Sequence, residues 1–153
     1  MRPSSAIRGA EPMAAFLGIS FLSHLLWENA QAPLYRGFIS FSQHFWMCLK
    51  GTVGDMLFML VIYATLAVVH RNPLWMNDRV AYTHPATWIL APFVGMLLAV
   101  SFELWAVYVD RRWEYMEAMP LIPVLQIGLT PVLQMILIPL IALLLTFRFP
   151  RSA

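Results

Sequence analysis

Charged residues are scarce in this sequence, and cysteine is almost absent. Only 12% of the 153 residues are charged, about half the fraction usual in soluble domains, whereas 60% are hydrophobic. So apolar a chain needs lipid around it, which excludes an ordinary soluble globular protein. The single cysteine, Cys48, cannot form an internal disulfide or a cysteine-rich metal cluster. The ten basic residues form no stripe or patch, so nucleic acid is not an expected partner.

Four long apolar stretches stand out in the remaining sequence. Each has roughly the 20 residues that a helix needs to cross a hydrocarbon core about 30 Å thick. The predicted spans are Pro12–Ala32, Gly51–Val69, Thr87–Val109 and Leu121–Phe147. The sequence therefore predicts a single all-α domain over residues 1–153, a polytopic membrane protein built as a bundle of about four transmembrane helices.

The segments around the second and fourth spans are irregular. The mixed polar and aromatic segment Arg36–Lys50 precedes the second span and is predicted to be interfacial or re-entrant. Pro131 removes a main-chain donor and Gly128 has low helix propensity, which predicts a kinked or broken fourth helix between them. An ordinary proline-kinked span is the alternative, since Pro and Gly are common in membrane helices. The polar connector His70–Pro85 is expected to be a surface loop.

The distribution of Lys and Arg indicates the orientation, because basic residues are enriched in cytoplasmic loops. With four spans, the side that holds both termini carries six of them, which are Arg2, Arg8, Arg71, Arg79, Arg148 and Arg151. The opposite side carries four, which are Arg36, Lys50, Arg111 and Arg112. This count predicts that both termini lie in the cytoplasm.

Polar residues inside the predicted spans gather in the half of the bundle away from the termini. Glu28, Asp55 and Glu103 fall at similar depth in three different spans, and His24 lies one helical turn from Glu28 on the same face. A charged residue at the bilayer centre costs about 2.5–3.5 kcal/mol on insertion scales, so these acids must be protonated, paired or open to water. We therefore predict a polar pocket in the outer half, with these four residues as its catalytic groups. The alternative is that the acids lie at headgroup level, where a charge costs little.

Other polar and aromatic residues at this depth are predicted to contact a ligand. They are Trp27, Asn29, Gln31, Trp105, Arg112, Tyr115, Gln126 and Gln134. Neither a cofactor nor a metal site is predicted. The pairs His24/Glu28 and His44/Cys48 have the i, i+4 spacing of two ligands on one helical face, but such pairs arise often by chance and belong to no His-Glu-x-x-His or Cys-x-x-Cys motif.

Several short runs resemble those of a group of small bacterial inner-membrane proteins. The runs are Trp27–Tyr35, Gly54-Asp55, Arg112–Pro120 and Gly128–Gln134, which read WENAQAPLY, GD, RWEYMEAMP and GLTPVLQ. The resemblance extends from about Trp27 to Pro139 and implies a bacterial inner-membrane location. It implies no substrate, since no activity is assigned to that group.

These patterns leave several functions open. The chain could bind or modify a lipid-like or small hydrophobic molecule, with carboxylate and histidine groups transferring protons, and whether it is an enzyme is undecided. It could instead be an accessory subunit of a larger membrane complex, or a small carrier that works as a homo-oligomer. A metalloprotein is the remaining alternative. The expected partners are the lipid bilayer, a lipid-like ligand, and further copies or subunits within the membrane.

Overall fold

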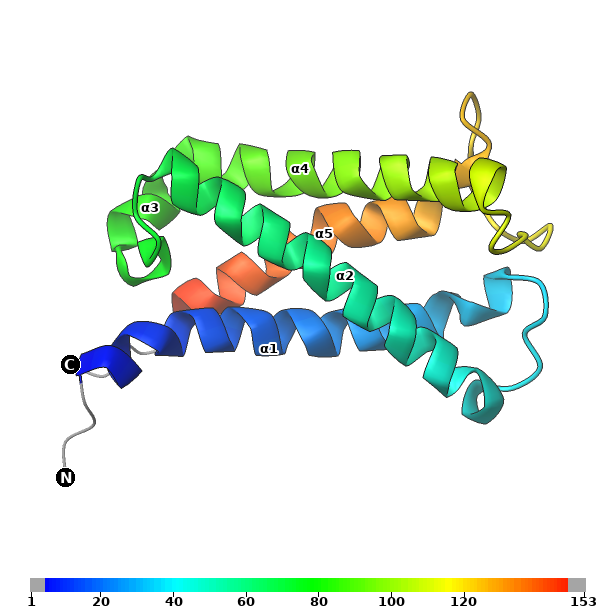
Figure 1. Cartoon of the computed structure of the whole chain (residues 1–153), viewed down its shortest axis with the longest axis horizontal. Helices are drawn as coiled ribbons and strands as arrows, with labels where there is room; N and C mark the ends of the chain where they lie inside the picture. Colours follow the sequence, from blue (N-terminus) through cyan, green and yellow to red (C-terminus); the bar gives the residue numbers. More distant parts are fainter. Residues whose placement is uncertain (1–4, 149–153) are drawn as a thin grey trace.

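Four long helices make up most of the chain in the computed structural model, which describes residues 5–148 (Figure 1). They are α1 (Ser5–Gln31), α2 (Phe41–Val69), α4 (Pro85–Leu104) and α5 (Leu129–Arg148). Each runs opposite to the long helix before it, so that α1 begins and α5 ends at the same end of the molecule (Figure 1). We call this the terminal end and the opposite one the loop end.

The four helices pack as neighbours around a common core. The pairing of α4 with α5 is the most extensive, α1 packs on α2 and α5, and α2 also packs on α4. Small residues at every fourth position of α4 allow this close approach, namely Thr87, Ala91, Gly95 and Ala99. A Cβ at Gly95 would lie only 2.0 Å from the carbonyl oxygen of Met135 on α5. Glycine at this position therefore determines how close the two helices lie.

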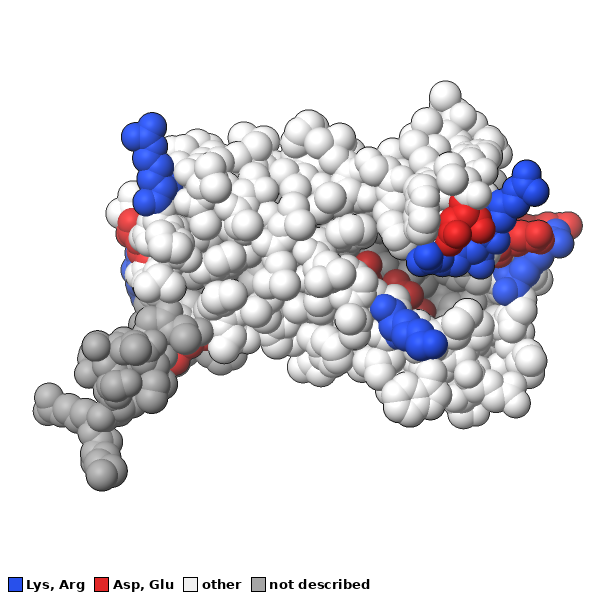
Figure 2. All heavy atoms as spheres, viewed as in Figure 1, with Lys and Arg blue, Asp and Glu red and all other residues white. Residues whose placement is uncertain are grey.

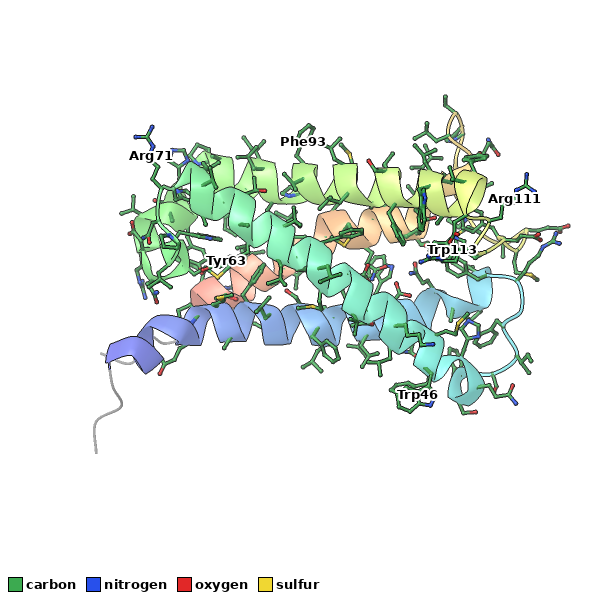
Figure 3. The ribbon with its side chains drawn as sticks, in the orientation of Figure 1. Trp46, Tyr63, Arg71, Phe93, Arg111 and Trp113 are labelled. Atoms are coloured by element: carbon green, nitrogen blue, oxygen red, sulfur yellow. The ribbon has the colours of Figure 1, made fainter. Side chains whose placement is uncertain are left out.

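Three of the long helices have the length and apolar character of membrane spans. They are α2, α4 with its continuation to Val109, and α5. Their outward faces are apolar, as at Leu57 and Ile89, which are 61% and 64% exposed. Charged side chains in Figure 2 lie near the two ends of the visible face and in one hollow, with an uncharged band between the ends. Figure 3 shows Phe93 projecting outward from α4 within this band, so the chain is a mostly helical membrane protein.

The helix α1 is long enough to span a membrane but is not among these three. Its 27 residues include Glu11, Ser20, His24 and Glu28, which lower its mean hydropathy. Ser20 and His24 are completely buried, on the face that packs against the other helices.

The second span begins earlier in the structure than the sequence predicted. The helix α2 begins at Phe41, ten residues before the predicted Gly51, because the Ser40 side chain caps it by accepting a hydrogen bond from the Gln43 backbone N–H. Most of Arg36–Lys50 is thus the first part of one continuous helix and not a separate interfacial or re-entrant segment. The first span also differs, since α1 starts before Pro12 and ends at Gln31.

The fourth predicted span is shorter than expected. Residues Leu121–Ile122 (β1) and Ile127–Gly128 (β2) pair as a small antiparallel ribbon, and α5 begins only at Leu129. Gln126 closes the turn with a positive φ of 53°. A hairpin followed by a shorter helix therefore replaces the longer helix, kinked or broken between Gly128 and Pro131, that the sequence predicted.

The connector between α2 and α4 packs against the terminal end of the helices. It contains the 3-10 helix η2 (Trp75–Asn77) and the short helix α3 (Arg79–Thr83), and four of its residues are buried, namely Trp75, Met76, Ala81 and Tyr82. The Tyr82 ring contacts that of Phe147 on α5, with centroids 5.3 Å apart. The expectation of a simple surface loop is therefore wrong, because its aromatic residues complete the apolar core.

Candidate functional site

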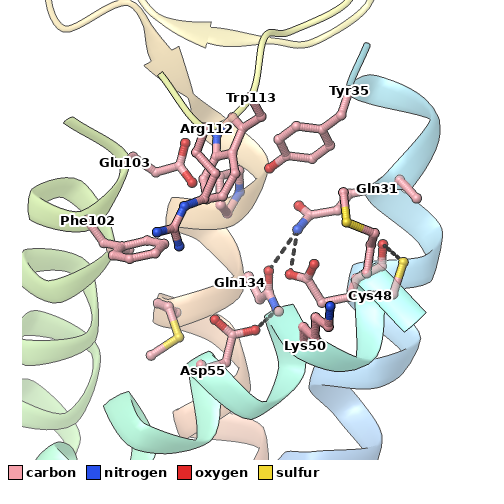
Figure 4. A pocket seen from close by; sticks show the side chains of 18 of the residues that line it. Gln31, Tyr35, Cys48, Lys50, Asp55, Phe102, Glu103, Arg112, Trp113 and Gln134 are labelled. Atoms are coloured by element: carbon pink, nitrogen blue, oxygen red, sulfur yellow. Dashed lines mark hydrogen bonds between the residues drawn. The ribbon is translucent and has the colours of Figure 1, made fainter. Parts of the chain in front are cut away.

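A cavity of about 440 Å³ lies among α1, α2, α4 and α5 near the loop end. Figure 2 shows it as a hollow with acidic atoms inside, and Figure 4 shows it from close by. Glu28 on α1, Asp55 on α2 and Glu103 on α4 all line it, and Glu103 is only 4% exposed. Its volume falls within the range of about 300–1,000 Å³ that is typical of small-molecule sites.

Two glutamine side chains connect the acids on α1 and α2. Gln31 Nε2 donates to Glu28 Oε1 over 2.8 Å and to Gln134 Oε1 over 3.1 Å. Gln134 Nε2 donates to Asp55 Oδ2 over 2.8 Å and lies 2.9 Å from His24 Nδ1. His24 is buried next to the cavity with Nδ1 3.3 Å from Asp55 Oδ2. One chain of polar contacts thus runs from Glu28 to His24.

The third acid has a separate set of neighbours. The Tyr115 hydroxyl donates a hydrogen bond to Glu103 Oε2. Burial and this hydrogen bond raise the pKa of Tyr115, whereas burial and the nearby carboxylates of Glu103 and Glu28 raise that of Tyr35. Both phenols therefore keep their protons at neutral pH and remain hydrogen-bond donors.

Two connections that are far apart in sequence meet at the loop end of the cavity. The Arg36 backbone N–H donates to Glu114 O over 2.9 Å, and that of Met116 donates to Leu34 O over 2.9 Å. Tyr35 and Tyr115 are paired as an isolated antiparallel bridge. This pairing brings Tyr35 and Trp113 to the cavity lining.

Aromatic rings form a continuous wall along the cavity. Ring centroids lie 6.0 Å apart between Tyr35 and Trp113, 5.9 Å between Trp113 and Phe102, and 5.7 Å between Phe102 and Phe58. We call these four residues the aromatic wall. Two basic side chains, Lys50 and Arg112, also line the cavity and are exposed residues (Figure 4).

Most of the polar residues predicted for the pocket reach it, but not all. The cavity is lined by Glu28, Gln31, Asp55, Glu103, Arg112 and Gln134, and also by His44 and Cys48. Five predicted ligand-binding residues are not part of its lining, namely Trp27, Asn29, Trp105, Tyr115 and Gln126.

Local hydrogen bonds and stacking explain several of these differences. The Asn29 side chain donates to the Leu25 carbonyl of its own helix, and that of Gln126 donates to the Pro123 carbonyl in the exposed hairpin turn. Trp105 is 40% exposed and lies beneath the Arg112 guanidinium, with Cζ 4.8 Å from the ring centroid.

Of the weak metal-site candidates, His44 and Cys48 both line the cavity, whereas His24 and Glu28 have different partners. His24 contacts Asp55 on α2, whereas Glu28 bonds to Gln31. Among the described residues, no group of three or more His, Cys, Asp or Glu side chains is arranged to hold a metal ion.

Tyr35, Trp113 and Phe102 are lining residues that the sequence did not assign to the site. Tyr35 and Trp113 belong to the runs that carry the resemblance, but their positions suit an aromatic belt at the membrane surface equally well. Only the long-range pairing of the two connections brings them to the cavity. No model of a protein family, no curated protein and no solved structure matches this chain, so its function has to be argued from the site.

Proposed function

We propose that this protein binds a lipid-like molecule in the cavity and exchanges a proton with it. The proposal rests on one observation: Glu28, Asp55 and Glu103, from three different helices, all line one cavity in an otherwise apolar assembly. Ionisable residues within membrane helices are costly and usually serve ligand or proton handling. These acids are the proposed proton-transfer groups, and His24 takes part through its contact with Asp55.

The position of the opening favours a ligand that comes from the membrane. Met47 and Leu57 both line the cavity, yet they are 62% and 61% exposed on the outer surface of α2. The cavity therefore opens beside an apolar surface that lipid would cover. Phe58, Phe102 and Met135 extend the apolar lining inward, which suits the hydrocarbon part of an amphipathic molecule.

The packing toward the terminal end argues against a carrier. Phe16, Met59, Ile62, Leu66 and Leu143 are buried there and at most 1% exposed. Ser20, the nearest buried hydroxyl on α1, is bonded to the Phe16 carbonyl of its own helix. Among the described residues, this core offers no polar path from the cavity to the terminal end, so binding or catalysis from one side is favoured over transport.

We further propose that α1 is a fourth span in a bacterial inner membrane, with both termini in the cytoplasm. α1 lies alongside α2 and α5, and its Leu22 and Leu26 side chains are 61% and 73% exposed, as lipid-facing residues would be. The six-to-four distribution of basic residues supports the orientation, although Arg2 and Arg151 lie outside the described residues. The resemblance supports the bacterial location.

Photo-crosslinking in lipid nanodiscs tests the binding. We expect a phospholipid with a diazirine in its acyl chain to label residues around the cavity opening. Gly54→Leu should lower this labelling, because Gly54 lines the cavity and a Cβ there meets nothing within 4 Å. Gly18→Leu is the matched control, since a Cβ there is equally unhindered and Gly18 lies outside the cavity. Labelling spread evenly over the apolar surface, and unchanged by Gly54→Leu, would contradict a bound lipid.

Neutralising the acids tests the proton exchange. Glu28→Gln or Glu103→Gln should leave the protein inserted and folded but abolish the proton uptake or release that accompanies ligand binding, measured with a pH-indicator dye. Glu114→Gln is the control, because its side chain is 73% exposed at the same end and is not part of the cavity. Unaltered proton exchange in both cavity variants would reject the proposed role of the acids.

A further inference from the structure

We infer that the ligand is a phospholipid whose headgroup carries a primary ammonium beside its phosphate. This inference rests on the proposed function and specifies the chemistry of the same cavity. It follows from how the polar groups are distributed within the cavity, with hydrogen-bond acceptors inside and cationic groups at the exposed edge.

The inner part of the cavity is rich in hydrogen-bond acceptors. The hydrogen bonds from Gln31, Gln134 and Tyr115 each use one oxygen of an acid, at Glu28, Asp55 and Glu103 respectively. A carboxylate can accept about four hydrogen bonds, so acceptor capacity remains on all three acids.

Gln31 adds an acceptor that has no partner. Its side chain is 5% exposed, and Oε1 is buried without a hydrogen bond from the described residues. Figure 4 shows the Gln31 amide directed into the cavity. A buried polar atom without a partner is costly, so a ligand that supplies a donor here would be favoured.

The aromatic wall indicates that the hydrogen-bond donor of the ligand is a cation. Tyr35, Phe58, Phe102 and Trp113 border the same cavity as the acids. An ammonium ion is attracted both by the faces of aromatic rings and by carboxylates. A primary ammonium has three N–H donors and can bond to several of these acceptors at once.

The exposed edge of the cavity has the opposite charge. Lys50, on α2, takes part in no ion pair with the other described residues, and Arg112 uses only Nε in its 2.7 Å contact with Asp110. Lysine and arginine bind phosphate through charge-assisted hydrogen bonds. A phosphate between these two side chains would leave its ammonium among the acids and its acyl chains on the apolar surface beside Met47 and Leu57.

A headgroup series in the nanodisc assay tests this assignment. The probes are diazirine phospholipids with identical acyl chains and a phosphoethanolamine, an N-acetylated phosphoethanolamine or a phosphoglycerol headgroup. We expect the phosphoethanolamine lipid to label the cavity residues about tenfold more than either of the others, the ratio expected from one lost ionic contact. Equal labelling by all three would overturn the ammonium assignment and leave the proposed function intact, whereas no cavity labelling by any of them would overturn both.

Two variants and one competitor complete the test. Lys50→Gln should lower the labelling by all three lipids to a similar extent, because each carries a phosphate, whereas Arg36→Gln, an exposed basic residue at the same end outside the cavity, should leave the labelling unchanged. Undiminished labelling of Lys50→Gln by all three lipids would overturn the phosphate position. Water-soluble phosphoethanolamine at millimolar concentration should not displace the labelled lipid, and complete displacement would reject a membrane lipid in favour of a soluble molecule of the same chemistry.

Discussion

Gln134 links three of the four long helices through a single amide group. From α5 it accepts a hydrogen bond from Gln31 on α1 and donates to Asp55 on α2, while His24 on α1 lies within hydrogen-bond distance. The Gln134 side chain is 1% exposed, so its amide depends mainly on these protein partners for its hydrogen bonds. Its position between the acids makes it a structural requirement of the site.

We predict that Gln134→Met lowers the free energy of unfolding by about 3 kcal/mol, since it leaves buried donors and acceptors without partners. Cys48 reports this directly, because it is the only cysteine and is 3% exposed, so a thiol-reactive fluorophore labels it as the protein unfolds on heating in detergent. Gln43→Met, at an exposed position in the first turn of α2, should change stability by no more than about 0.5 kcal/mol. Equal unfolding temperatures for the two variants would show that the network adds no stability.

His70 is a pH-sensitive group at the other end of the molecule. Its Nε2 lies 2.8 Å from Thr87 Oγ1, and the Thr87 hydroxyl donates to the Ala81 carbonyl, so neutral His70 donates to Thr87. Burial and the neighbouring His84 lower the pKa of His70, and Asp78 opposes them in part. Protonation is therefore less favourable in the folded state than in the unfolded one.

We predict that the lowered pKa of His70 makes the protein less stable as the pH falls below about 6.5, the ordinary histidine value. Above that pH both states are neutral at His70 and the stabilisation is complete. Below it the unfolded state takes up the proton first. Unfolding temperatures between pH 8 and pH 5 should fall less steeply in His70→Gln than in the native protein, and identical slopes would count against the prediction.

At the scale of the elements, the contact between α4 and α5 depends on the absence of a single side chain. A Cβ at Gly95 would meet the Met135 carbonyl oxygen at 2.0 Å, and backbone cannot move aside as a flexible side chain would. Glu103 and Gln134 lie toward the loop end of these same two helices. The spacing of α4 from α5 therefore influences the width of the cavity.

We predict that Gly95→Ala destabilises the protein by about 2 kcal/mol or more, because the two helices must separate. It should also reduce lipid labelling in the cavity, although Gly95 does not line it. Gly18→Ala provides the comparison, since a Cβ at Gly18 meets nothing within 4 Å and alanine favours helix by up to about 1 kcal/mol. A Gly95→Ala protein as stable as Gly18→Ala would mean that the helices tolerate a wider spacing.

At the scale of the whole molecule, the long helices alternate in direction, which predicts the side of the membrane on which each connection lies. α1 begins where α5 ends, and the connection after α4 lies at the opposite end, where Arg111 is labelled (Figure 3). We predict that a green fluorescent protein fused to the C-terminus fluoresces in the bacterial cytoplasm. Alkaline phosphatase inserted after Glu117 should be active in the periplasm. An active phosphatase at the C-terminus would reverse the orientation or remove one crossing.

Much of the helical content follows from local sequence, but several helix boundaries do not. The runs of apolar residues require helices wherever lipid surrounds the backbone, because every main-chain polar group must then be paired within the segment. The start of α2 at Phe41 depends on the Ser40 cap, and that of α5 at Leu129 on the hairpin before it. Apolar composition does not reveal either feature, since Leu121 and Ile122 are as hydrophobic in a strand as in a helix.

For the candidate site, the sequence predicts the depth of the acidic residues in the membrane but not which residues contact them. Glu28, Asp55 and Glu103 occur at matching distances along their spans, and the cost of burying a charge in lipid predicts a pocket near them. Which residues complete the site depends on rotation and pairing of elements that are remote in sequence. Gln126 and Gln134 looked equivalent, yet the hairpin turns one outward while α5 places the other between Asp55 and Gln31. Likewise, Tyr35 and Trp113 reach the cavity only through the backbone pairing of residues 34–36 with 114–116. The sequence could not predict this pairing, because contacts between distant segments are set by the packing of the whole chain and leave no periodic signal within either segment.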